Sequence, residues 1–487
     1  MKNRIVAATV VAAAASIGFA QTRGVDLHGA TLFEGRPFIT DGGVYNGYDL
    51  GGSPLGLFDA GQSRMNVDLG YRYYGFGDET GHYLSGQSLR MGDPGRSFFE
   101  VFYGPDILSN SNSGNAATLP VQRFGLVLAT QGTSGASRFS FLAEGYFGTQ
   151  KWDSGDNSRA LMGVERLRVD LGSQVHPLVR FGLFVGVTAR LDTLRAGYED
   201  VAFQMNLPEF GGNIDFGGED MPARSNLYGS YAFSRYIYRA NGAGGPTAIY
   251  GNQADAIRND SLNIFWMAQG RIPVNDDYTV RPGLLFGYTG NYGEMRIPVG
   301  DNDNPVNLGE ARKGSSYDLT GVWFGIGAGF EALKYADVHV EYTLAAMSLK
   351  WGEAGSSYQN YNPPAGDRSR TLHHTAFGVS TPLHEYVALP LNITPRVAYF
   401  ISGSAGIAGA RHSSFEPMNV VSGKSKNYLY RPQNFLDGFE RTSGFTFGVD
   451  GQAFEEMLSV SYWMTFLSKN TVSKGGMELG LSAEFSL

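Results

Sequence analysis

The sequence predicts an all-β chain that folds as a transmembrane antiparallel β-barrel of about 14–16 strands with long extracellular loops. Three observations predict this fold class. Long stretches alternate between apolar and polar residues, glycine contributes 67 of the 487 residues, and only 17% of the residues are charged. The mean hydropathy of −0.19 also disfavours a bundle of membrane-spanning helices, each of which would need about 18 consecutive apolar residues.

The first twenty residues have the layout of a secretory signal peptide. Lys2 and Arg4 form a short positive region, residues 5–15 are apolar, and small residues precede Gln21 at the expected cleavage site. A buried N-terminal helix is the alternative reading. We therefore expect a signal peptide over residues 1–20, a periplasmic or lumenal N-terminal segment over residues 21–60, and the barrel over residues 61–487.

The C-terminal stretch shows the clearest alternation. From Met477 to Leu487, apolar residues occupy every odd position, and Glu, Gly or Ser occupies every even position. Strands of soluble proteins usually have about 5–6 residues, whereas a strand that crosses a membrane needs about 9–11. A barrel with lipid outside and a polar lumen explains both the length and the two faces.

The same alternation recurs upstream, and it indicates strands centred near 69, 100, 126, 143, 167, 185, 232, 266, 284, 325, 342, 376, 397, 447, 462 and 481. Phe184, Trp323 and Trp463 are large apolar residues on the otherwise polar face. Short connections are expected near 173–177, 273–277, 332–336 and 452–456, and long loops near 193–225, 291–317, 352–369 and 404–442. A secreted β-sandwich or propeller remains the soluble alternative.

Charged residues on the polar face are the candidate functional residues. They carry both signs, and opposed charges along a lumen select solutes in porins. The alternative is that they form pairs that fill the lumen and have no role in transport. The predicted lumen-facing residues are Asp68, Arg72, Arg166, Arg168, Arg190, Glu341, Glu478 and Glu484.

The sequence indicates no catalytic, metal or cofactor site. There is no cysteine, which excludes disulfides, thiolate zinc sites and cysteine nucleophiles. His373 and His374 would point to opposite faces of a strand, and His339 lies between two acidic residues without a Gly-x-Ser-x-Gly elbow. The formal net charge of −8 argues against nucleic acid as a partner.

The C-terminal alternation of Leu479, Leu481, Ala483 and Phe485 resembles the last strand of Gram-negative outer-membrane β-barrel proteins, although the chain ends in Leu487 and not in an aromatic residue. This resemblance implies the bacterial outer membrane, contact with its lipid, and recognition of the last strand by the barrel-assembly machinery. Residues 52–57, Gly-Ser-Pro-Leu-Gly-Leu, resemble the element before the first strand of the fourteen-stranded long-chain fatty-acid transporter group and its type IX secretion relatives. That narrower resemblance implies a lumenal hatch over residues 21–60 and a hydrophobic cargo.

The sequence therefore predicts an outer-membrane barrel that passes a small solute or a hydrophobic ligand. The alternative is a non-conducting surface barrel that acts in adhesion, structure or secretion through its long loops.

Overall fold

A computed structural model describes most of the chain from residue 65 onward, together with Ile39 and Leu55. The described residues are 39, 55, 65–76, 79–83, 87–93, 95–110, 119–154, 157–196, 199–217, 221–241, 257–298, 311–332, 336–351, 368–386, 392–405, 442–454, 457–469 and 476–486. The predicted signal peptide and most of residues 21–60 lie outside this part.

The described residues form twenty strands and one short 3-10 helix. They are β1 (Met65–Phe76), β2 (Glu79–Tyr83), β3 (Gln87–Asp93), β4 (Ser97–Asn110), β5 (Leu119–Ser134), β6 (Ser137–Ser154), β7 (Asn157–His176), β8 (Val179–Ala196), β9 (Glu199–Phe216), β10 (Ala223–Asn241), β11 (Ile257–Gly270), β12 (Ile272–Pro273), β13 (Tyr278–Pro298), β14 (Ala311–Ala332), β15 (Ala336–Trp351), β16 (Arg368–Ser380), η1 (Leu383–Glu385), β17 (Asn392–Ala405), β18 (Thr442–Ala453), β19 (Leu458–Lys469) and β20 (Gly476–Ser486).

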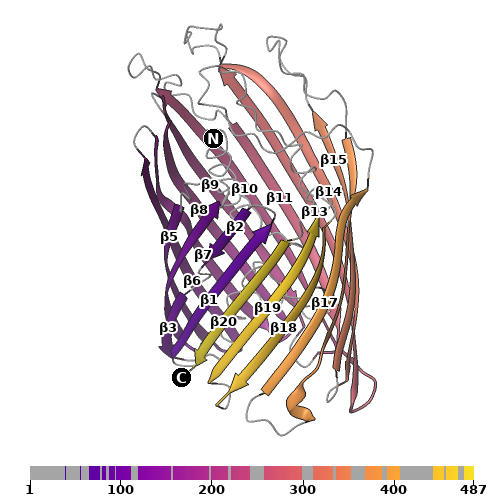
Figure 1. Ribbon diagram of the computed structural model, residues 1–487. Coiled ribbons are helices and arrows are strands. Elements are labelled where there is room, and N and C mark those ends of the chain that lie inside the picture. The colour runs from indigo at the N-terminus through magenta and orange to yellow at the C-terminus, as the bar shows by residue number, and fades with distance from the viewer. Residues whose placement is uncertain are drawn as a thin grey trace.

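The strands close into one barrel. Apart from the short strands β2, β3 and β12, each strand pairs antiparallel with the strands beside it in chain order, and β1 pairs with β20 from Asn66 opposite Ser486 to Phe76 opposite Gly476. Among the described residues, the twenty strands fill eighteen positions, because β2 and β3 both lie between β1 and β4, and β12 continues β11 along β13. Figure 1 shows the resulting inclined wall. The predicted all-β barrel is confirmed.

The barrel has more strands than the predicted 14–16. All sixteen predicted centres fall in strands. Of the two further positions, one is filled by β9 and the other is shared by β2 and β3. β9 occupies much of the stretch 193–225, where a long loop was predicted. That loop prediction is wrong, because the strand pairs with both β8 and β10. Its apolar residues stand at odd positions up to Leu207 and at even positions from Phe210 onward, so the alternation changes phase at Pro208.

The short connections follow the prediction. β7 and β8 are separated by Pro177 and Leu178, and β12 and β13 by residues 274–277, where Asn275 accepts a hydrogen bond from the Asp277 backbone N–H at 2.9 Å. At the opposite end of the barrel, β8 and β9 remain paired up to Ala196 and Glu199. The predicted long loops near 352–369 and 404–442 lie almost wholly outside the described residues.

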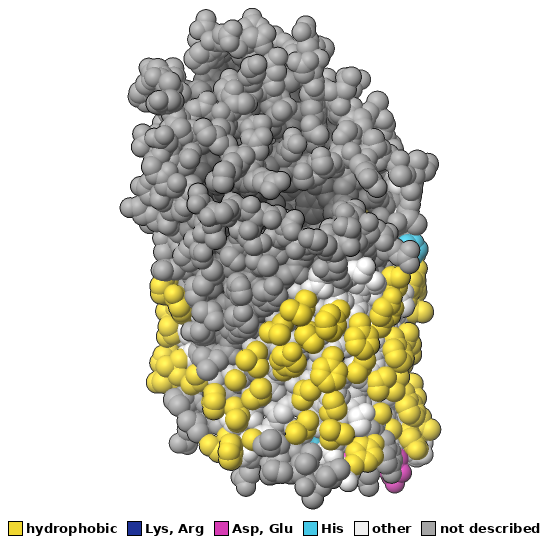
Figure 2. All heavy atoms as spheres, in the orientation of Figure 1, with side chains coloured by type: hydrophobic (Ala, Val, Ile, Leu, Met, Phe, Trp, Pro, Cys, Tyr) yellow, Lys and Arg dark blue, Asp and Glu magenta, His cyan; other side chains and the backbone are white. Residues whose placement is uncertain are grey.

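The outer wall carries the apolar side chains. On β8, Leu183 and Val185 are 65% and 60% exposed, whereas Phe184 between them is 6% exposed. The same exposure of large apolar residues runs around the described wall and forms the belt of yellow side chains in Figure 2. Because this surface is apolar and the closed sheet pairs its backbone groups internally, the chain is a membrane-spanning barrel. No helix of the described residues is long and apolar enough to cross a membrane.

The wall is not equally tall around the barrel. β13 and β14 have 21 and 22 residues, whereas β19 and β20 have 12 and 11. At about 3.3 Å per residue, the longest strands reach roughly 70 Å, well beyond an apolar band about 25 Å tall. Figure 1 shows the shorter strands β1 and β18–β20 side by side at the front.

Glycine makes room for large side chains on the inner wall. In seven pairs between the described strands, an inward aromatic ring or arginine lies over a glycine of the neighbouring strand, where a Cβ atom would overlap or crowd it. These pairs are Phe184 with Gly211, Phe265 with Gly287, Arg281 with Gly329, His339 with Gly378, Arg396 with Gly448, Phe400 with Gly444 and Trp463 with Gly480. Much of the glycine on the polar face thus serves to hold these side chains flat against the wall.

Candidate functional site: the lumenal wall

Ile39 lies inside the barrel although it precedes the first strand. Its backbone N–H donates a hydrogen bond to the Glu341 carboxylate on β15 at 2.7 Å, and its carbonyl oxygen accepts one from the Gln269 side chain on β11. The Ile39 side chain is 1% exposed. Both backbone polar groups of Ile39 are therefore satisfied by buried side chains of the wall, as burial requires.

The Ile39 side chain joins an apolar cluster on the lumenal side. The cluster contains Ile39, Phe184, Tyr228, Phe265, Met267 and Leu285, with Trp323 packed against it. Phe184 stacks on Tyr228 at 6.2 Å between ring centroids, and Phe265 lies 6.4 Å from Trp323. We call this set the Ile39 cluster.

The Ile39 cluster explains two exceptions in the sequence pattern. Phe184 and Trp323 occupy polar-face positions because they turn inward and pack in this cluster. The Trp323 indole N–H is satisfied there by Thr289 Oγ1 at 2.8 Å. The lumen is thus not uniformly polar, since one side of it contains a packed apolar core.

Arg168 is tied to the same cluster. Its guanidinium donates to both carboxylate oxygens of Asp170, two residues further along β7, with Nε 2.7 Å from Oδ2. It also lies over the Phe184 ring, 3.7 Å from the centroid. Since its side chain has no exposed surface, Arg168 acts in this structure as a packed and paired residue.

A second apolar cluster lies on the inner wall of β4–β6. Phe98, Val127, Ala129 and Leu142 belong to it, and Leu142 is fully buried. These residues alternate with exposed outward neighbours such as Leu128 and Phe141. This stretch of the inner wall is therefore apolar and packed, like the Ile39 cluster.

Ion pairs line the wall toward the short-turn end. Arg281 on β13 pairs with Asp337 on β15, and Arg396 on β17 pairs with Asp450 on β18, whose other oxygen accepts from Ser461 at 2.6 Å. Asp337 and Asp450 are 27% and 35% exposed, whereas their arginines are 11% and 5% exposed. In both pairs, the carboxylate is the group that water reaches more easily.

A third ion pair lies next to Asp337. Glu331 on β14 is the direct cross-strand partner of Asp337, and its carboxylate lies 3.5 Å from Arg271. Arg271 is 60% exposed and therefore neutralises its partner less tightly than the buried arginines do. Two of the three pairs thus expose the carboxylate more than the arginine, and the third exposes Arg271 more than Glu331.

The predicted site residues are not brought together directly. Among them, only Arg168 and Glu341 have described side chains, and they are linked through the Ile39 cluster, with Arg168 over Phe184 and Glu341 bound to Ile39. The others are placed by their backbones alone: Asp68 and Arg72 in β1, Arg166 in β7, Arg190 in β8, and Glu478 and Glu484 in β20. Asp68 is the cross-strand partner of Glu484.

The histidines are arranged as the sequence predicts. His339 lies on one face with Asp337 and Glu341. His373 and His374 point to opposite sides: His373 Nδ1 lies 2.8 Å from the Tyr342 hydroxyl, whereas the buried His374 ring lies 6.0 Å from Phe400. No group of three or more potential metal ligands occurs within the described residues.

Sequence reasoning missed most of the groups that matter here. Arg281, Arg396 and Asp450 stand at polar-face positions of predicted strands, so the alternation could have found them, but their partners are set by strand register. Ile39 carries no such signal, because it lies in a glycine-rich stretch without alternation.

Comparisons with known proteins give the fold alone. No family model matches the chain, and no curated protein matches it. The ferric citrate transporter FecA in its unliganded form aligns at 11% identity and a TM-score of 0.41, over 87% of this chain and 79% of FecA. The copper transporter OprC aligns at 7% identity and a TM-score of 0.45, over 88% and 81%. OprD from Pseudomonas aeruginosa aligns at 14% identity and a TM-score of 0.32, over 88% and 94%.

These likenesses are too distant to assign a substrate. Its closed sheet and apolar belt identify the chain as a membrane-spanning β-barrel, as the sequence predicts.

Proposed function

We propose that this barrel passes small hydrophilic solutes across the outer membrane and favours cations over anions. The observation that carries the proposal is the unequal exposure within the ion pairs of the lumenal wall. The carboxylates of Asp337 and Asp450 are 27% and 35% exposed, while their partners Arg281 and Arg396 are 11% and 5% exposed. Charged groups that line a pore set its ion selectivity.

We further propose that the N-terminal segment over residues 21–60 narrows the lumen. The support is Ile39, which is hydrogen-bonded to Glu341 and Gln269 and packed in an apolar cluster of the wall. A single anchored residue of this kind would hold the segment at one side of the barrel. The lumen would then keep an open passage beside Asp337 and Asp450.

A hydrophobic cargo is the second candidate, as the resemblance to the fatty-acid transporter group implies. The apolar Ile39 cluster inside the lumen favours it. Two observations weigh against it. The described strands fill eighteen positions in the barrel wall and not fourteen. The Ile39 side chain is itself buried in the Ile39 cluster and so occupies the place that a hydrophobic cargo would take. Recognition of β20 by the barrel-assembly machinery also remains a proposal, supported by the strict alternation along this strand.

Planar-bilayer recording under a KCl gradient tests the principal proposal. The wild-type protein should conduct and give a reversal potential of the sign expected for cation selectivity. Glu331→Gln should move this potential toward zero, because it removes an accessible carboxylate without leaving a buried arginine unpaired. Glu385→Gln is the matched control, since Glu385 lies in η1, in the turn between β16 and β17.

Anion selectivity, or equal potentials for Glu331→Gln and wild type, would contradict the cation preference. A folded protein that does not conduct at all would support the alternative, a surface barrel acting in adhesion, structure or secretion.

A further inference from the structure

Three buried polar atoms on the inner face of β6–β9 have no hydrogen-bond partner within the part of the chain that the structure describes. They are the Ser140 hydroxyl, the Asn213 side-chain oxygen and Nη1 of Arg168. Ser140 and Asn213 are 5% and 4% exposed. The Asn213 amide nitrogen already donates to Asp215 at 2.9 Å, which leaves its oxygen as an acceptor. Since native structures leave few buried polar atoms unpaired, these three indicate that a partner belongs here.

The wall between Ser140 and Asn213 has no side chains. Ser140 of β6 is opposite Gly172 of β7, Gly172 is opposite Gly182 of β8, and Gly182 is opposite Asn213 of β9. The four residues form one row on the inner face, about 14 Å long at roughly 4.8 Å between neighbouring strands. We call this row the glycine floor. Because glycine has no Cβ atom, another backbone can approach the floor closely.

The glycine floor adjoins the Ile39 cluster. Asn213 is the cross-strand partner of Tyr228, and Phe184 lies two residues beyond the floor on the inner face of β8. Both aromatic residues belong to the cluster, and the Arg168 guanidinium lies over the Phe184 ring. The three polar atoms thus lie next to the place where Ile39 is bound.

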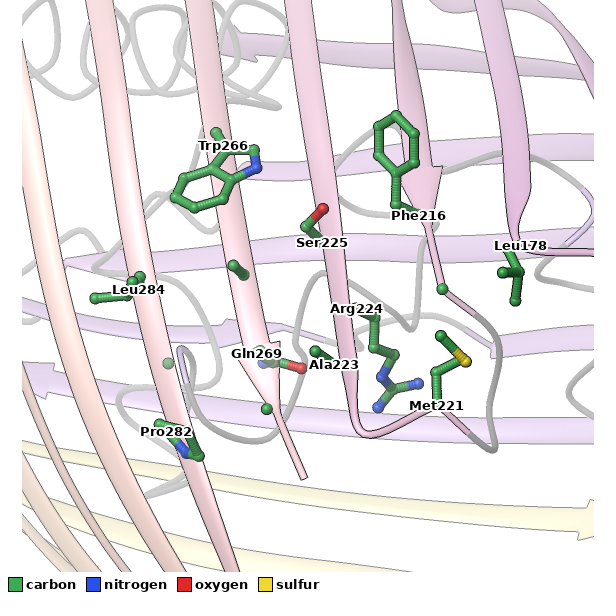
Figure 3. A pocket seen from close by; sticks show the side chains of 14 residues that line it. Leu178, Phe216, Met221, Ala223, Arg224, Ser225, Trp266, Gln269, Pro282 and Leu284 are labelled. Carbon is green, nitrogen blue, oxygen red and sulfur yellow. The ribbon is translucent and has the colours of Figure 1, made fainter. Parts of the chain in front are cut away.

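The path from Ile39 to the glycine floor is short. Gln269, which binds the Ile39 carbonyl, lies near the end of β11, opposite Arg224 of β10 (Figure 3). Asn213 stands two strands away and four residues further along the strands in this register. This separation is roughly 16 Å, which about five extended residues span. Ser140, three strands beyond Asn213, needs about four residues more.

We propose that residues 40–54 lie over the glycine floor and that their peptide groups pair with Ser140, Asn213 and Arg168. A peptide N–H suits the Asn213 oxygen, and peptide carbonyls suit the hydroxyl and the guanidinium as donors. Asp170 already neutralises Arg168, so the floor offers hydrogen bonds and not a net charge. The proposal rests on the proposed function, in which the N-terminal segment narrows the lumen, and it adds a second anchor on β6–β9.

Residues 40–54 are the occupant that the chain itself supplies. They join Ile39 to Leu55, and these two residues are 1% and 0% exposed, so both ends of the stretch are held within the protein. Five of the fifteen residues are glycine, and only Pro54 lacks a backbone N–H. Glycine in the stretch and in the floor lets the two backbones come close enough to hydrogen-bond.

Disulfide scanning of the full chain, which has no cysteine of its own, tests the proposal. Ser140→Cys and Asn213→Cys are each combined with a cysteine at one position from 43 to 50. After mild oxidation of the folded barrel in vesicles, mass spectrometry should detect a disulfide for each wall position. The preferred partner of Ser140→Cys should lie about four residues beyond that of Asn213→Cys, given the length of the floor. Ala143→Cys, on the outer face of β6 two residues after the exposed Phe141, is the matched control and should form none.

A second arm tests the hydrogen bond to Ser140 itself. Ser140→Ala should raise the rate at which a membrane-impermeant thiol reagent modifies Gly47→Cys about two- to tenfold, because it removes one hydrogen bond between the segment and the wall. Ser173→Ala, on the outer face of β7, is the matched control and should leave the rate unchanged. This arm decides the question if the cysteine pairs do not give a folded barrel.

The absence of a disulfide at both wall positions, or an unchanged rate with Ser140→Ala, would overturn the proposal. Water or a solute would then be the partner of these polar atoms. The proposed function would survive that result as long as the wild-type barrel conducts and prefers cations, so the two failures are distinguishable.

Discussion

Shortening the side chain of Ile39 should release the N-terminal segment from the lumenal wall. Ile39→Ala keeps the backbone N–H and carbonyl that bind Glu341 and Gln269, but it empties a pocket in which the side chain is 1% exposed. Truncating a buried isoleucine to alanine costs about 2–5 kcal/mol. At 1.4 kcal/mol per factor of ten, docking should weaken by about 30-fold to several thousand-fold.

The cysteine-free sequence offers a direct assay. A single cysteine introduced as Met267→Cys lies in the Ile39 cluster, where Met267 is 2% exposed. A membrane-impermeant thiol reagent should modify this cysteine slowly when Ile39 is present. With Ile39→Ala, the modification rate should rise, and the rise should approach the factor by which docking weakens. Thr446→Cys, at a fully buried position on β18, is the control and should keep its rate.

Equal modification rates for Met267→Cys with and without the Ile39→Ala substitution would refute this prediction. That result would mean that Ile39 does not cover this part of the wall. A rise at both cysteines would instead indicate general loosening of the barrel, and it would likewise refute a local anchor.

Two further predictions concern the stability of the folded barrel, measured by urea unfolding in lipid vesicles. Gly444→Val should lower the free energy of unfolding by about 1–3 kcal/mol, because the new side chain overlaps the Phe400 ring. Gly229→Ala should change it little, because its Cβ would make only an ordinary contact of 3.9 Å with the Asn263 carbonyl oxygen. Arg168→Met should cost about 3–5 kcal/mol because it leaves Asp170 buried without its partner; an unchanged midpoint would show that this carboxylate is solvated or protonated.

The sequence predicts the face of each strand better than the number of strands. Leu481 and Phe485 point outward on β20, and Leu183 and Val185 do so on β8, because period-two alternation is a local property of the chain. The same reasoning fails for β9, because its alternation changes phase between Leu207 and Phe210. Its strand character comes from pairing with β8 and β10 and not from its own residues.

The candidate site is predictable only in part for a related reason. That Arg168 turns inward follows from alternation, but its burial against Phe184 depends on the register of β7 and β8. Glu341 was identified as a lumen residue, yet its partner Ile39 lies 302 residues away. Contacts at that separation arise from closure of the whole barrel, which no local pattern encodes.

The inner-wall glycines that lie under large side chains also help to set the register between neighbouring strands. Sliding a strand by one residue would turn its apolar side chains into the lumen, so the alternation already forbids it. Sliding a strand by two residues keeps each side chain on its face, so the alternation does not disfavour it. It would, however, take the rings of Phe400 and Trp463 off Gly444 and Gly480 and set them against other residues. Glycine placement thus selects one alignment among those that hydrophobicity leaves equivalent, and so helps to fix the stagger with which the barrel closes.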